Sequence, residues 1–147
     1  MSSFWKRWLS VWCLGVVAFG LVLYGAGFAA TTAPAAEIFA AFGTPLPADP
    51  DRYLRFAISL MGAVTCGWGV TFYAAFRAAW SLEPARSAGV WRILTIAAAA
   101  WYVIDSSSSV ANGFAVNAVS NSLLVAAYLI PVVASGVLRA DAVDRSI

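Results

Sequence analysis

The sequence predicts an all-α integral membrane protein, a bundle of four transmembrane helices with both termini in the cytoplasm. Of its 147 residues, 62% are hydrophobic and only 11% are charged, whereas soluble domains carry about 25% charged residues. The apolar residues fall into four long runs, and most basic residues lie on one side of those runs. Four spans use most of the chain, so we expect a single membrane domain, 1–147.

The first span is expected at about 9–30. A basic pair, Lys6 and Arg7, precedes this apolar run, which ends in Ala29-Ala30; that pattern also suits a signal peptide. The run is roughly 22 residues long, however, and a signal peptide needs an apolar core of about 7–15 residues. We therefore expect a membrane span.

The second span is expected at about 54–76. It follows Asp49-Pro50-Asp51, which offers an N-cap acid, a proline at the first helical position and a further acid in the first turn. Negative charge and proline both favour a helix N-terminus. The helix is therefore expected to begin here.

The third and fourth spans are expected at about 90–111 and 114–138, separated by a turn at Asn112-Gly113. The third run is apolar only as far as Ile104, which is too short to cross a hydrocarbon core of about 30 Å. This helix must therefore continue through Asp105 and the following serines. In the fourth span, Pro131 removes a backbone donor, and Tyr128 and Ser135 are candidate partners for the freed carbonyl.

The charges predict the orientation. Arg52 and Arg55 are the only basic residues on one side of the spans, and the other seven lie on the opposite side: Lys6, Arg7, Arg77, Arg86, Arg92, Arg139 and Arg145. Basic loops remain in the cytoplasm, so the seven face inward. Four tryptophans mark the same boundary, where such rings anchor helices: Trp5, Trp8, Trp80 and Trp91.

The loop at 31–53 is then external. Its first half, 34–42, suits a short amphipathic helix with an apolar edge formed by Ile38, Phe39 and Phe42, and Gly43 is a natural stop. Two positions are open for this edge. It can lie on the bilayer or cap the end of the bundle.

Asp105 is the strongest candidate for a functional residue, because an acid inside a span costs at least about 2.5–3.5 kcal/mol on insertion scales. Helical spacing places Ser108 or Ser109, and then Asn112, along its side of span three. On span four, Asn117 and Asn121 are four residues apart and share a face, and folding the hairpin brings Asn121 to nearly the depth of Asp105. The predicted cluster is either polar glue between helices or a ligand, ion or proton site.

Arg55 is the candidate positive partner. It begins a stripe of mostly small residues on span two: Arg55, Ser59, Gly62, Cys66, Gly69 and Tyr73. Small residues let membrane helices approach closely, so this face is expected to be buried, and an Arg55–Asp105 pair is predicted. The alternative is that Arg55 snorkels to the interface.

Absent residue types exclude several kinds of site. The chain has no histidine, so it lacks the ligands of a bis-His haem or a histidine-based zinc site, and the base of a Ser-His pair. Its one lysine, Lys6, is terminal. Cys13 and Cys66 fall in separate apolar segments, which gives a disulfide framework little support. No cofactor, metal site or nucleic-acid partner is expected.

The layout resembles that of the DoxX-like small bacterial four-helix membrane proteins. The shared features are a short first span, an external loop, a glycine-bearing second span that opens with Leu54-Arg55, and a hairpin that includes the fourth helix. The chain departs from these proteins in span three, where they tend to keep an arginine and this chain has Asp105. The resemblance implies the fold and a bacterial setting, but no mechanism.

The sequence is compatible with three functions. The favoured hypothesis is a small non-catalytic protein of the bacterial inner membrane, an accessory or assembly subunit or a homo-oligomeric scaffold, whose partners are lipids and other membrane subunits. The second is an oligomeric transporter or channel with Asp105 as a proton or cation site. The third is a lipid- or quinone-binding enzyme, with Asp105 as base and Arg55 as a headgroup clamp.

Overall fold

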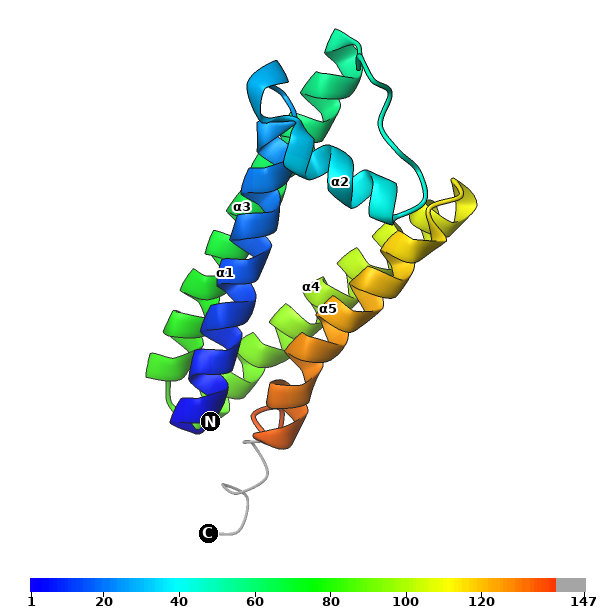
Figure 1. Cartoon of the computed structure of the whole chain (residues 1–147). Helices are drawn as coiled ribbons and strands as arrows, with labels where there is room; N and C mark the ends of the chain where they lie inside the picture. The colour runs from blue at the N-terminus through cyan, green and yellow to red at the C-terminus, as the bar shows by residue number, and fades with distance from the viewer. Residues whose placement is uncertain (140–147) are drawn as a thin grey trace, which may run out of the picture. The chain divides into compact units, whose positions relative to one another are not determined.

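A computed structural model describes residues 1–139, and in this range the regular secondary structure is helical (Figure 1). It has five α-helices: α1 Ser3–Gly25, α2 Ala33–Ala41, α3 Arg52–Ser81, α4 Pro84–Ala111 and α5 Ala115–Ala134. A short 3-10 helix, Ala29–Thr31, lies between α1 and α2. Helices α1, α3, α4 and α5 are 23, 30, 28 and 20 residues long and apolar enough to cross a membrane. The prediction of four long apolar helices is confirmed.

The helices differ from the predicted spans mainly at their ends. Helix α3 continues beyond residue 76 to Ser81, and α4 begins at Pro84 rather than near residue 90. Hydropathy detects where a helix is apolar, whereas the backbone stays helical through Arg and Ala, which are good helix formers. Pro84 sets the start of α4, because proline fits the first helical position. Helices α1 and α5 end earlier than predicted, near Gly25 and before Gly136, whose φ is +64°.

The predicted course of α4 and its turn is confirmed. Helix α4 runs through Asp105 and the serines to Ala111, and the turn that follows uses Gly113 with φ +85°.

The predicted cap of α3 was wrong in its register. The helix begins at Arg52, so Pro50 precedes it and the capping acid is Asp51 rather than Asp49. Asp51 Oδ1 accepts hydrogen bonds from the backbone N–H groups of Tyr53 and Leu54, both at 2.8 Å. A carboxylate at this position satisfies N–H groups that have no partner within the helix.

The chain divides into two compact units, and helices α1 and α3 contribute to both. Unit 1 combines 1–12 with the chain from residue 71 onward, and unit 2 is 13–70. The single membrane domain, 1–147, stays a prediction.

Unit 1 has an aromatic core. Phe76 is fully buried and stacks on Trp91 and Tyr128, with ring centroids 5.2 Å and 6.0 Å apart. Trp12 and Phe72 complete the group, with their centroids 5.8 Å apart. Aromatic pairs of this kind add to the stabilisation from burial alone. The core therefore joins α1, α3, α4 and α5 within this unit, and Trp91 is a core residue rather than an interfacial anchor.

Two indole N–H groups of α1 bind the backbone of α5. Trp8 Nε1 donates to the carbonyl of Ala127 at 2.8 Å, and Trp12 Nε1 donates to that of Leu124 at 3.0 Å. The Ala127 carbonyl would normally accept from residue 131, which is Pro131 and has no N–H. The predicted partners of this carbonyl were wrong. Trp8 takes that role, because Tyr128 bonds to Thr95 and Ser135 to the carbonyl of Pro131.

Unit 2 brings α1 and α3 into close contact along the predicted stripe. A Cβ on Gly62 would overlap the backbone nitrogen of Tyr24, and one on Gly20 would lie 2.7 Å from that of Cys66. Real Cβ atoms do not approach other atoms so closely, so only glycine fits at these two points. Cys66 Sγ also donates to the carbonyl of Val17 at 3.4 Å. The small residues Gly62, Cys66 and Gly69 of the stripe therefore face α1, as small residues at a helix contact predict, whereas Tyr73 at the end of the stripe is exposed.

Helix α2 packs on the same unit through its own apolar side. Ala35 is fully buried with Leu23, Ala26 and Ile58, and Phe39 lies against this cluster. Helix α2 ends at Ala41, and Gly43 adopts φ +77°, so the predicted stop is confirmed. Part of the apolar edge of α2 thus covers the packed ends of α1 and α3.

We expect Trp8→Phe to lower the free energy of unfolding by about 1–2 kcal/mol, because it leaves the Ala127 carbonyl unpaired. In a Pro131→Ala background the cost should fall below about 1 kcal/mol, since the alanine that replaces the proline brings its own N–H. Thermal and denaturant unfolding in mild detergent measures the cycle.

The matched control for this cycle is Trp5→Phe, also on α1, where the ring contacts Phe4 and Trp8. This change should give the same effect in both backgrounds. An equal cost of Trp8→Phe with and without Pro131 would show that the indole does not compensate for the missing N–H.

Candidate functional site

Asp105 lies on the side of α4 that faces α5, about 9 Å from the end of the helix at 1.5 Å per residue. Its Oδ1 accepts hydrogen bonds from Ser109 Oγ at 3.2 Å and Asn117 Nδ2 at 3.4 Å. Asn117 Nδ2 also donates to Ser109 Oγ at 2.8 Å. These three side chains, the Asp105 cluster, join the two helices. The residue of α5 that reaches Asp105 is Asn117 rather than Asn121, which was predicted at its depth.

Further polar pairs continue along the same helix contact. Asn121 Nδ2 donates to Ser106 Oγ at 3.4 Å. Two hydroxyl pairs follow, Tyr102 with Ser122 at 2.9 Å and Thr95 with Tyr128 at 3.1 Å. Together with the Asp105 cluster they form what we call the polar ladder, which ties α4 to α5 over most of their shared length (Figure 1).

Two predicted members lie outside the ladder. Asn112 is exposed and its Nδ2 donates to the backbone carbonyl of Ser108 at 2.8 Å. This contact closes the last turn of α4, where carbonyl groups have no partner further along the helix. Of the two serines considered for the cluster, Ser109 is the buried one, at 8% exposure, and Ser108 is exposed.

Arg55 has its partners in unit 2. Its guanidinium donates to the carbonyl of Pro50 at 2.9 Å, to Thr32 Oγ1 at 3.1 Å and to Asp49 Oδ1 at 3.5 Å. The side chain is 22% exposed, whereas that of Asp49 is fully exposed. Arg55 thus holds both ends of the loop that contains α2. Its pairing with Asp105 stays a prediction that joins the two units.

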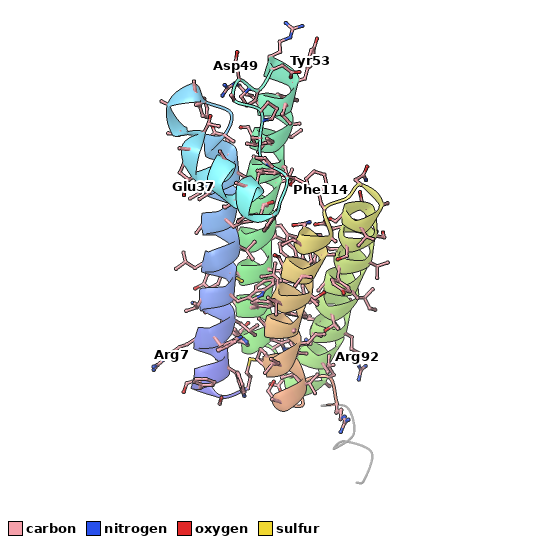
Figure 2. All side chains as sticks on the ribbon, turned by 45° about the vertical axis from the view of Figure 1, so that its right-hand side comes forward. Arg7, Glu37, Asp49, Tyr53, Arg92 and Phe114 are labelled. Atoms are coloured by element: carbon pink, nitrogen blue, oxygen red, sulfur yellow. The ribbon has the colours of Figure 1, made fainter. Side chains whose placement is uncertain are left out.

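We call these contacts of Arg55 with Pro50, Thr32 and Asp49 the Arg55 clamp. Figure 2 labels Asp49 and Tyr53 near the start of α3, and Glu37 on α2. Arg52, one turn from Arg55, behaves differently. It stacks over the ring of Tyr53 at 4.7 Å and donates to its hydroxyl at 2.6 Å. Of the two arginines, only Arg55 connects distant parts of the chain.

The carboxylate of Asp105 has one oxygen that is free to bind a proton or a ligand. Both of its described hydrogen bonds end on Oδ1, so within residues 1–139 the second carboxylate oxygen receives no hydrogen bond. That oxygen can hold a proton or accept from a ligand. The described residues contain no group of three His, Cys, Asp or Glu side chains placed to hold a metal ion. A shallow groove opens beside the ladder, lined in part by Tyr102, Ser106 and Ser122.

Sequence reasoning missed the two hydroxyl pairs of the ladder that lie farthest from the Asn112-Gly113 turn. Tyr102 and Ser122, and Thr95 and Tyr128, are common in membrane helices and carry no charge, so none of them stands out alone. The hairpin geometry could have found them. When two helices fold back at the Asn112-Gly113 turn, residues that lie equally far from the turn come opposite each other. Serine and threonine are also usually read as bonding to their own helix.

Comparison with family models, with curated proteins and with solved structures gives no match to this chain. The likeness to the DoxX-like proteins therefore remains one of layout.

We expect Arg55→Ala to lower the free energy of unfolding by about 1–3 kcal/mol, because it removes charge-assisted hydrogen bonds that close the loop. The control Arg52→Ala should cost less than about 1 kcal/mol, since an exposed cation–π contact contributes little. Melting in detergent measures both. Equal destabilisation by the two substitutions would contradict the clamp.

Proposed function

We propose that this chain is a small, non-catalytic, multi-pass membrane protein that acts by association, as an accessory or assembly subunit or as a homo-oligomeric scaffold. The polar ladder carries this proposal. Its polar side chains bond to one another across α4 and α5, which is the arrangement that holds membrane helices together.

The charges of unit 1 support an orientation with the termini in the cytoplasm of a bacterium. Six basic side chains lie where α1 begins, α3 ends, α4 begins and the chain leaves α5: Lys6, Arg7, Arg77, Arg86, Arg92 and Arg139. We call this the basic end. The opposite end of the hairpin, at Phe114, has no charged residue in its turn (Figure 2). Positive charge favours the cytoplasmic side.

A transporter or channel is the second candidate, and one observation favours it. The second oxygen of Asp105 accepts no hydrogen bond from the described residues, although an intramembrane acid is usually paired or functional. A proton or a small cation would satisfy that oxygen. The enzyme hypothesis has less support, because the Arg55 guanidinium that would clamp a headgroup already bonds to Pro50, Thr32 and Asp49.

Asp105→Asn separates the first two functions. Asparagine keeps an oxygen to accept from Ser109 and Asn117, and it removes a charge that costs at least about 2.5 kcal/mol inside a membrane. We therefore expect the variant to keep its assembly and to melt at the same or a higher temperature than the wild type.

Two assays on the full chain test this expectation. Gentle purification with mass spectrometry measures which subunits and which oligomer remain, and proton or cation flux across liposomes measures transport. Asn112→Ala, at the exposed end of α4, serves as the control. A folded Asp105→Asn protein that loses a flux shown by both the wild type and the control would establish the transporter instead.

A further inference from the structure

The basic end of unit 1 carries a strong excess of positive charge. Among the described residues of this end, the six cations are accompanied by one carboxylate, Glu83. Between side chains of residues 1–139, the ion pair found is that of Arg55 with Asp49, which belongs to unit 2. An excess of one sign creates a field that attracts groups of the opposite sign.

The cations of this end differ in their contacts with the rest of the unit. Arg92 donates to the carbonyl of Leu138 at 3.0 Å and 3.2 Å, which ties the chain after α5 to α4. Lys6, by contrast, lies over the ring of Trp80 at 5.8 Å, and Arg77 reaches only the Tyr73 hydroxyl at 3.5 Å. Arg7 and Arg86 are exposed, and the Arg7 side chain points away from α1 (Figure 2).

The tryptophans near these cations favour a position at the depth of lipid headgroups. Trp5 and Trp8 lie on the same two turns of α1 as Lys6, and Trp80 lies one turn after Arg77 on α3. Tryptophan rings prefer the boundary between headgroups and hydrocarbon. Lys and Arg next to such rings reach the level of the phosphates, because their long side chains extend toward the polar side.

We propose that the basic end is a binding surface for anionic lipid headgroups, formed by Lys6, Arg7, Arg77 and Arg86. The recognised chemistry is a phosphate ester whose negative charge is not balanced within the headgroup, as in phosphatidylglycerol. A zwitterionic headgroup carries its own cation and gains less. This surface goes beyond the proposed function, and it lies at the end of the hairpin opposite the Asp105 cluster.

Intrinsic fluorescence provides the test, since three of the seven tryptophans, Trp5, Trp8 and Trp80, lie at this end. The full chain is reconstituted in phosphatidylcholine vesicles that contain equal fractions of either brominated phosphatidylglycerol or brominated phosphatidylcholine. We expect the wild type to be quenched more strongly by the anionic lipid. Lys6→Gln, Arg7→Gln, Arg77→Gln and Arg86→Gln together should lower this preference severalfold, because each juxtamembrane cation contributes up to about fivefold.

Arg52→Gln is the matched control, as an exposed arginine of unit 2, and it should keep the preference. If the fourfold variant folds poorly, Arg7→Gln alone must still lower the preference. Equal quenching of the wild type by both lipids, or a preference unchanged in the variants, overturns the proposal in favour of an acidic protein surface as the partner. A preference abolished by inorganic phosphate at constant ionic strength overturns it in favour of a soluble anion.

Discussion

The structure depends on one constraint, that lipid offers no hydrogen-bonding partner to a polar group. This chain places an acid, several hydroxyls, two amides and the carbonyl that Pro131 leaves open inside its apolar helices. Many of these groups bond to a neighbouring helix, whereas serines such as Ser107 and Ser120 bond to their own. Asp105, Asn117 and Asn121 bond across α4 and α5, and Trp8 bonds from α1 to the carbonyl that Pro131 leaves open. In unit 1, hydrogen bonds therefore hold α5 against α4 and α1, and the aromatic core adds α3.

In unit 2, helices α1 and α3 are held together by close packing at glycine positions rather than by hydrogen bonds between polar side chains. Gly20 and Gly62 allow the backbones of α1 and α3 to touch, and dispersion contacts then replace the missing hydrophobic force between membrane helices. At the end of this contact, Arg55 closes the loop that carries α2. The two units thus use the two means of association that a membrane allows, hydrogen bonds and close packing.

The sequence predicts the helices well because hydropathy, proline and glycine signals act locally. It also predicts a polar cluster at Asp105, since a short turn at Asn112-Gly113 brings α4 against α5, but it places Asn121 rather than Asn117 opposite the acid. It does not predict the Trp8 bond to Ala127 or the clamp around Arg55. Both depend on contacts between residues distant in the chain, and such contacts have no local pattern.

The central claim, that Asp105 and its neighbours hold α4 against α5, is tested most directly by a double-mutant cycle on Asp105→Ala and Asn117→Ala. Unfolding free energies are measured in mild detergent, with Asp105→Ala and Asn112→Ala as a control pair that should be additive. The account predicts a coupling energy of about 0.6–1.7 kcal/mol between Asp105 and Asn117, the range for hydrogen bonds between membrane helices. Additive effects in both cycles would contradict it.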